Sequence, residues 1–224
     1  MEIPIITIDG PSGTGKGTLA SRLTRRLGWH LLDSGALYRV VAYRAQQLGI
    51  ALNEAHELAN LAGALPLDFQ IEGDAVQILL NAVDITDELR SETAGSAASQ
   101  VAALPEVRSA LLVYQREFLR PPGLVADGRD MGTVVFPAAN LKIFLTGSPK
   151  IRAERRYKQL KQKGIDVNLA RLSEEIAARD RRDEQREVSP LLPASDAIIL
   201  DTTALNIASV EDSVKALARD RGLM

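Results

Sequence analysis

The chain has 224 residues, a length that suits one compact α/β domain and is short for two large independent ones. Its 46% hydrophobic and 25% charged residues are typical of soluble globular proteins, and its net charge of −2 excludes a general attraction to nucleic acid or to anionic membranes. The absence of cysteine excludes disulfides and thiolate metal sites.

The histidines argue against a zinc site, and the apolar segments argue against a membrane span or a signal peptide. His30 and His56 are the only histidines, and neither lies in a motif with metal-ligand spacing, so a zinc site is not expected. No segment approaches about 18 uninterrupted apolar residues, and the acidic Glu2 and then Gly10 leave no apolar core of signal-peptide length. We therefore expect a cytoplasmic protein.

The N-terminal part alternates strand and helix. Residues 3–8 are rich in isoleucine and uncharged, and glycine and proline follow them, which predicts a buried strand. Leucines spaced four apart predict a helix over 15–27. The stretch "WHLLDSG" predicts a second strand, and its Asp33 can cap a helix over 36–48.

Residues 67–84 break this alternation. They predict two or three short strands, with turns at residues 72–74 and near Asn81, and so a small β insertion in an α/β frame. A helical stretch over 93–119, interrupted at Pro105, follows it.

The C-terminal half supplies three more apolar strands, in "GLVADGRD", "LKIFLTG" and "DAIILDT". Two charged helices lie between the last two strands, and a helix over 207–219 ends the chain. Five apolar strands separated by helices predict a parallel, doubly wound sheet, whose ligand sites lie beyond the carboxyl ends of the strands.

The stretch "IDGPSGTGKGT" matches the phosphate-binding loop, with the spacing Gly10-x-x-x-x-Gly15-Lys16 between a strand and a helix. Such a loop points backbone N–H groups and a helix N-terminus at phosphate. A cation in the first turn of a helix is unfavourable by ~0.3–1 kcal/mol unless an anion faces it, and nucleotide phosphates would be that anion for Lys16.

The loop departs from the usual pattern at one position. Gly17 replaces the Ser or Thr that ligates Mg²⁺, and the hydroxyl comes one residue later, at Thr18. We therefore expect phosphates, waters and a carboxylate to hold Mg²⁺. Candidates for the carboxylate are Asp9, Asp33 and Asp130, which spacing does not rank, and no residue is assigned as a direct metal ligand.

The stretch "RDRRDEQR" is the main candidate for the acceptor side. Continuing the apolar stripe of Leu169, Leu172 and Ile176 by helical steps gives Arg179, Asp183 and Arg186, so the inward face becomes charged. A solvated helix end is the alternative. Residues 150–187 hold 12 Lys or Arg against 8 Asp or Glu, and the segment lies between the last two strands, which favours a site for phosphates.

Two further groups of charges support such a site. Arg152, Arg155 and Arg156 in "KIRAERRYK" suit a lid over residues 150–166 that excludes water. At the tip of the third strand, "LVADGRDMG" places Asp127, Arg129 and Asp130 where burial without a ligand or partners would be costly.

These motifs together resemble the bacterial cytidylate (CMP) kinase family, a group of P-loop nucleoside monophosphate kinases. The resemblance covers essentially the whole chain and rests on "IDGPSGTGKGT", "LLDSGALYR", "ASQVAALPEVR", "ADGRDMGTVVFP" and "RDRRDEQR". It implies transfer of the γ-phosphoryl group of ATP to CMP or dCMP, with Mg²⁺ as cofactor, in a monomer that binds neither nucleic acid nor membrane.

The resemblance also implies a division of the single P-loop kinase domain, residues 1–224. The core comprises 1–33, 120–147 and 188–224, and the lid with its arginine-rich helices comprises 148–187. The nucleoside-monophosphate-binding region, 34–119, carries the β insertion.

Residue roles follow from the same resemblance. ATP would bind to Gly10, Pro11, Ser12, Gly13, Thr14, Gly15, Lys16, Gly17 and Thr18, and to the lid arginines Arg152, Arg155 and Arg156. The cytosine pocket would hold Ser34, Arg108, Arg129 and Asp130. The sugar would meet Ser99, Arg179 and Asp183, and the acceptor phosphate Arg39, Arg129 and Arg186. The residues implied in catalysis are Lys16, Arg129, Asp130, Arg179 and Arg186.

The chemistry of cytosine agrees with these roles. Cytosine has an N4 amino donor where uracil has an O4 acceptor, so a carboxylate such as Asp130 accepts from cytosine and rejects uracil. Asp183 can accept from a sugar hydroxyl, and the sequence does not decide between the 2′ and 3′ hydroxyls.

Three other functions stay open. One is another small-metabolite kinase of this fold, acting on UMP, shikimate or dephospho-coenzyme A. The second is a P-loop switch or regulatory ATPase whose arginines dock a protein. The third, an RNA-binding module, is disfavoured by the acidic balance and by the single tryptophan.

Overall fold

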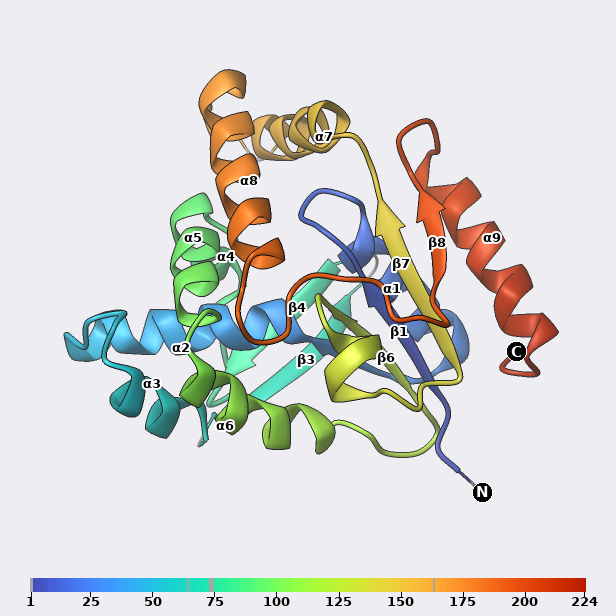
Figure 1. The fold of residues 1–224 in the computed structure, drawn as a ribbon, viewed down its shortest axis with the longest axis horizontal. Helices are drawn as coiled ribbons and strands as arrows, with labels where there is room; N and C mark the ends of the chain where they lie inside the picture. The colour runs from blue at the N-terminus through green and yellow to red at the C-terminus, as the bar shows by residue number, and fades with distance from the viewer. Residues whose placement is uncertain (1, 64, 73–74, 163) are drawn as a thin grey trace.

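The fold is built on a five-stranded parallel sheet, seen in a computed structural model that describes residues 2–63, 65–72, 75–162 and 164–224. The strands are β1 (Ile5–Asp9), β2 (His30–Asp33), β6 (Leu124–Gly128), β7 (Leu141–Thr146) and β8 (Ile198–Asp201). They lie in the order β2-β6-β1-β7-β8, and every neighbouring pair is parallel (Figure 1). The predicted parallel sheet is confirmed.

Helices cover both faces of this sheet because its inner strands are apolar on both sides. Helices α1 (Lys16–Leu27) and α9 (Ile207–Asp220) pack on one face, where Ile6 and Ile8 of β1 meet Leu19, Leu23 and Val214. Helices α2 (Ser34–Leu48) and α6 (Pro105–Arg116) belong to the core on the other face, with Ile5 and Leu32. The alternation of Ile5 and Ile6 follows the two-residue period of a strand.

The predicted β insertion is a three-stranded antiparallel sheet of β3 (Leu67–Glu72), β4 (Ala75–Leu80) and β5 (Val83–Asp84). Of the turn predicted at 72–74, residues 73 and 74 lie outside the described part of the chain. The second predicted turn is found at Asn81 and Ala82, whose φ angles of 51° and 62° are left-handed.

Four helices of the described chain flank the insertion, α3 (Ala55–Ala62) before it and α4 (Thr86–Leu89), α5 (Glu92–Val101) and α6 after it. Pro105 separates α5 from α6, as predicted, and it stands in the first turn of α6, where its missing N–H costs nothing. Two short helices were not predicted, namely α3 and α4.

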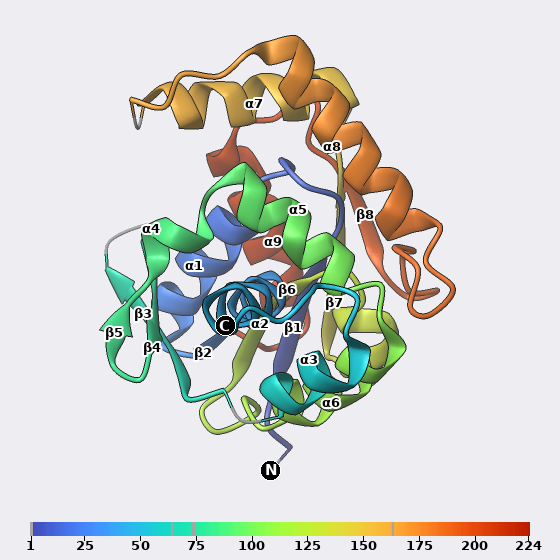
Figure 2. The same ribbon diagram turned by 90° about the vertical axis from the view of Figure 1, so that its left-hand side faces the viewer.

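Helices α7 (Pro149–Gln162) and α8 (Leu169–Glu184) lie beyond the carboxyl ends of the strands (Figures 1 and 2). They share a small apolar core of Ala153, Leu160, Leu172 and Ile176. The stripe predicted on α8 needs correction, because Leu169 is 40% exposed and the buried row runs from Leu172 and Ile176 to Asp180 and Asp183. Arg186 lies past the end of α8 and not within it.

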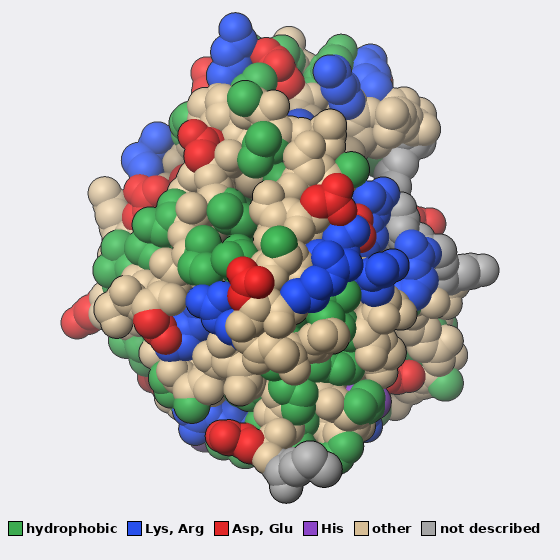
Figure 3. All heavy atoms as spheres, turned by 90° about the vertical axis from the view of Figure 1, so that its right-hand side faces the viewer, with side chains coloured by type: hydrophobic (Ala, Val, Ile, Leu, Met, Phe, Trp, Pro, Cys, Tyr) green, Lys and Arg blue, Asp and Glu red, His purple; other side chains and the backbone are tan. Residues whose placement is uncertain are grey.

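The face of the molecule on which α9 lies carries mixed charges. Figure 3 shows acidic and basic side chains interspersed with apolar ones on this face, with one group of Lys and Arg side chains to the right. No helix in the described ranges is both long and apolar enough to cross a membrane.

Candidate active site

The phosphate loop joins β1 to α1 at the carboxyl end of the sheet. It passes so close to β7 that a Cβ at Gly10 would lie 2.1 Å from the carbonyl oxygen of Leu145, and Gly10 has a φ of 140°. Gly15, the residue before α1, is left-handed and provides no side-chain cap, so the first N–H groups of α1 have no side-chain acceptor from this position. Backbone donors at a helix N-terminus are what a phosphate needs.

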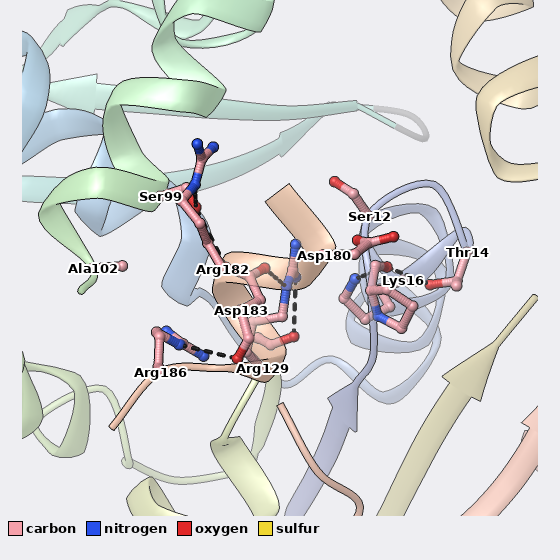
Figure 4. A network of polar contacts seen from close by, with 12 residues as sticks. Ser12, Thr14, Lys16, Ser99, Ala102, Arg129, Asp180, Arg182, Asp183 and Arg186 are labelled. Atoms are coloured by element: carbon pink, nitrogen blue, oxygen red, sulfur yellow. Dashed lines mark hydrogen bonds and ion pairs between the residues drawn. The ribbon is translucent and has the colours of Figure 1, made fainter. Parts of the chain in front are cut away.

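Lys16 lies in the first turn of α1 and is only 6% exposed. Its Nζ donates to the carbonyl oxygen of Pro11 at 2.9 Å (Figure 4). Burial and the nearby Arg129 guanidinium lower the pKa of Lys16 to about 7, and Asp127 opposes this shift. A buried ammonium group so close to a second cation is stabilised by a bound anion.

Gly17 leaves space beside a carboxylate of the next strand. A Cβ at Gly17 would lie 3.4 Å from Asp127 Oδ2, at the end of β6. Burial raises the pKa of Asp127 to about 6, although Lys16 lowers it, and Asp33 adds to the increase by repulsion. This carboxylate would gain from a further cation.

The three aspartates considered for Mg²⁺ have different surroundings. Both oxygens of Asp9 accept backbone N–H groups of η1 (Met131–Val135), a π-helical turn that follows β6. Asp33 caps α2 by accepting from the N–H of Ala36 at 2.9 Å. Asp130 forms an ion pair with Arg108. No cluster of three or more His, Cys, Asp or Glu side chains that could hold a metal occurs among the described residues.

Asp130 and Arg108 form a buried pair between β6 and α6. The Arg108 guanidinium also donates to the carbonyl oxygen of Ala102 at 3.2 Å, and it lies over the Tyr38 ring, 5.7 Å from the ring centroid. Asp130 is 3% exposed. A buried acidic acceptor beside a fixed guanidinium donor matches the hydrogen-bonding edge of a nucleobase.

A second network joins the core to α8. Arg129 Nε donates to Asp183 Oδ2 at 2.9 Å, and Ser99 Oγ of α5 donates to Asp183 Oδ1 at 3.4 Å (Figure 4). Arg182 Nε donates in turn to Ser99 Oγ at 3.2 Å. The three arginines Arg129, Arg179 and Arg186 lower the pKa of Asp183 although its burial raises it. The carboxylate therefore stays charged and can accept from a hydroxyl.

The remaining arginines repel one another in this part of the site. Burial, then Arg129 and Arg39, lower the pKa of Arg179 to about 9. Burial and Arg108 lower the pKa of Arg186. Arg179 Nε and one terminal nitrogen of Arg186 are buried with no acceptor in the described part of the chain. These donors and charges favour binding of an anion.

The three lid arginines do not point into this cluster. Arg152 donates to the carbonyl oxygens of Gly147 and Ser12 and pairs with Asp180 at 2.6 Å. Arg155 donates to Thr202 and to the carbonyl oxygen of Leu205. Arg156 pairs with Glu92 at 2.6 Å and so joins α7 to α5. All three guanidiniums are engaged by protein groups in this structure.

The structure therefore brings together most of the residues implied by the sequence. Arg129 and Arg179 lower the pKa values of both Lys16 and Asp183, and Arg39 lowers the pKa of Arg179, while Arg108 with Asp130 adjoins Arg186. Sequence reasoning missed Asp180, which fixes Arg152 against the phosphate loop, and Tyr38, which supports Arg108. Asp180 stands four residues after the buried Ile176, so the helical period was the signal that could have identified it.

The chain is also similar to known proteins. Residues 6–220 match the family model described as cytidylate kinase. A cytidylate kinase of Nitrosococcus oceani is 57% identical over 95% of both chains, and one of Pseudomonas fluorescens is 58% identical over 96% of this chain and 94% of its own. An uncharacterised protein from Eubacterium ventriosum shares the fold, with a TM-score of 0.52 at 12% identity over 98% of this chain and 99% of its own.

Proposed function

The chain belongs to the cytidylate kinase family, and from this premise we propose how it transfers the γ-phosphoryl group of ATP to CMP or dCMP. One P–O bond of ATP breaks and one forms to an oxygen of the acceptor phosphate, which gives ADP and CDP or dCDP. In this proposal the loop around Lys16 binds ATP, and the residues around Asp130 and Asp183 bind the acceptor.

The convergence of cations from separate elements is the observation that carries the proposal. Lys16 comes from α1, Arg129 follows β6 and Arg179 lies on α8. Besides burial, Arg129 lowers the pKa of both Lys16 and Arg179, and Arg179 lowers the pKa of Lys16. The folded chain holds these mutually repelling charges together, so a polyanion among them gains affinity. Two phosphate groups that approach for in-line transfer form such a polyanion.

Catalysis then depends on position and charge more than on a general base. Lys16 would hold the β- and γ-phosphates, and Arg129 and Arg179 would stabilise the charge that spreads over the transferring phosphoryl oxygens. Arg39 and Arg186 would hold the acceptor phosphate in line. The lid helices α7 and α8 would keep water away from the reacting atoms.

Recognition of cytosine falls to Asp130 and Arg108 in the proposal. Asp130 would accept from N4, and Arg108 would donate to O2 or N3. Uracil would place O4 against Asp130 and leave buried acceptors unpaired, so UMP would be rejected. Ser34 would complete the base pocket, and Ser99 and Asp183 would bind a sugar hydroxyl.

The surroundings of the loop fit a Mg²⁺ ion that ATP brings with it. Mg²⁺ prefers oxygen ligands and keeps several waters, so one buried carboxylate beside the phosphates suits it. Asp127 would be that carboxylate, since its pKa is raised to about 6 by burial and Gly17 leaves space beside it. The ion supplies charge neutralisation on the phosphate oxygens.

We extend the proposal to the organisation of the chain. It would act as a monomer in the cytoplasm. It would use 1–33, 120–147 and 188–224 as core, 34–119 as acceptor region and 148–187 as lid. Supporting observations are the separate apolar core of α7 and α8 and the α5–α8 contact that Ser99 and Asp183 make across the site.

Calorimetry with CMP alone, without ATP, tests the proposal against a regulatory ATPase. We expect CMP to bind, and Arg186→Ala to weaken this binding by about tenfold or more, because charge-assisted bonds to the phosphate of CMP are lost. Binding of ATP with hydrolysis that needs no acceptor, and no heat with CMP, would favour the ATPase.

A further inference from the structure

Asp9 ends β1 directly before the phosphate loop, yet its carboxylate binds another part of the chain. Asp9 Oδ1 accepts from the N–H of Met131 at 2.9 Å, and Oδ2 accepts from the N–H of Gly132 at 2.8 Å. The side chain is 5% exposed, so each bond lies in the protein interior. The two N–H groups belong to the residues that directly follow Asp130.

The backbone carbonyl group of Asp130 is also hydrogen-bonded. Its carbonyl oxygen accepts from the N–H of Val134 at 2.9 Å and of Val135 at 3.2 Å within η1. The peptide groups that follow Asp130 are therefore hydrogen-bonded within this turn and to Asp9, and these bonds hold the backbone from which the Asp130 side chain extends. Arg108 pairs with the carboxylate at the end of that side chain.

Packing around the turn is close on both sides. A Cβ at Gly132 would lie 2.9 Å from Thr7 Oγ1, and a Cβ at Gly128 would lie 2.7 Å from Met131 Cγ. The turn thus packs tightly against β1 and β6, and a shift of its backbone would move the carboxylate of Asp130.

We propose that Asp9 is a positioning residue for cytosine recognition, because it holds the backbone that sets the Asp130 carboxylate. The inference rests on the proposed function, in which Asp130 distinguishes CMP from UMP. Asp9 does not touch the nucleotide in this account; it acts through Met131 and Gly132. It also joins the cytosine-reading turn to the strand that leads into the phosphate loop.

The position requires a carboxylate because both N–H groups need an acceptor. An Asn side chain has one acceptor oxygen and one NH₂ donor, so in either orientation its NH₂ would face an N–H group. One buried N–H then loses its partner, or the turn moves to find another. Both results displace Asp130 relative to Arg108.

The test is the ratio of kcat/KM for CMP to that for UMP, at saturating ATP, in the wild type and in Asp9→Asn. We expect this ratio to fall by about tenfold, mainly because kcat/KM for CMP falls. Misplaced donors and acceptors reduce the discrimination between cytosine and uracil. Loss of folded protein would reduce both activities equally and leave the ratio unchanged.

Asp127→Asn is the matched control, with the same carboxylate-to-amide change one strand away. It lies beside Lys16 and Gly17, so we expect lower kcat with both CMP and UMP and an unchanged ratio. Gly132→Ala keeps Asp9 and displaces the same turn, so its ratio of kcat/KM for CMP to that for UMP should fall as in Asp9→Asn. It also provides the test if Asp9→Asn does not fold.

The outcomes separate the inference from the function on which it rests. A wild type that prefers CMP, with the same ratio in the folded variants Asp9→Asn and Gly132→Ala, overturns the role of Asp9 alone. A wild type that shows no preference for CMP over UMP overturns base recognition by Asp130 and the inference with it.

Discussion

Replacement of Asp130 by Asn probes base recognition most directly. The carboxylate is buried with Arg108, and the two side chains are 5% and 7% exposed. Asn keeps the shape and one acceptor oxygen, so Arg108 retains a partner. Its NH₂ group would make no hydrogen bond to the N4 donor of cytosine, whereas it would donate to O4 of uracil.

The expected effect follows from the loss of one charged acceptor. A hydrogen bond to a charged group contributes ~1.5–3 kcal/mol, so kcat/KM for CMP should fall by about 10- to 150-fold. The value for UMP should stay constant or rise, because its O4 gains a donor. The ratio of the two values, measured at saturating ATP, should therefore collapse towards one.

Asp183→Asn is the control for this prediction. Asp183 is buried like Asp130, at 4% exposed, and pairs with Arg129 at 2.9 Å, so the change in charge and the broken ion pair are comparable. Its proposed partner is a sugar hydroxyl, which CMP and UMP share, so both activities should fall together. An equal loss with CMP and UMP in Asp130→Asn would refute the account of base recognition.

Three further predictions concern Lys16 of the phosphate loop and the neighbouring carboxylate of Asp127. Lys16→Ala should lower kcat by about 100-fold or more, with CMP affinity in equilibrium dialysis nearly unchanged, because Lys16 acts on the donor phosphates; a large loss of CMP affinity would contradict this. Burial lowers the pKa of Lys16 to about 7, and bound phosphates should raise it, so ATP binding at pH 8 should take up protons. Calorimetry in buffers of different ionisation enthalpy measures this proton uptake, which should be lost in Lys16→Ala. If the wild type takes up no protons, the lowered pKa of Lys16 is contradicted. Burial raises the pKa of Asp127 from 3.8 to about 6, so the folded chain binds an extra proton between these values and its stability should fall as pH rises from 4 to 6. Asp127→Asn should reduce this fall by ~1–3 kcal/mol in urea titrations, and an unchanged slope would count against the shift.

The sheet and the phosphate loop could be predicted because local patterns encode them. Isoleucine-rich β1 and the glycine spacing after it specify a strand, a turn and a helix within 25 residues of sequence. The strand order could not be predicted, since β6 lies between β1 and β2 through pairing over about 100 residues.

Candidate residues that follow strands or a helical period lie in buried polar networks of the structure. Arg129, Asp130 and Asp183 are such residues, whereas the inward row of α8 was assigned wrongly at one step. The buried row turns from Ile176 to Asp180 and then Asp183, because Asp180 pairs with Arg152 of the neighbouring helix. A period read from apolar residues alone does not register such an ion pair.

Long-range polar contacts set the limit of what the sequence predicts. Asp9 stands before the loop and was a candidate for Mg²⁺, yet its partners lie 122 and 123 residues later in η1. Arg156 was expected near ATP and pairs with Glu92, 64 residues earlier. Neither contact has a local pattern that could reveal it.

Steady-state kinetics of the wild type with CMP, dCMP and UMP, each at saturating ATP, tests the central claim most directly. The account predicts that kcat/KM for CMP and dCMP exceeds that for UMP by about 100-fold or more, the discrimination that a buried, unpaired acceptor produces. Phosphorylation of UMP at a rate equal to or above that of CMP and dCMP would contradict it.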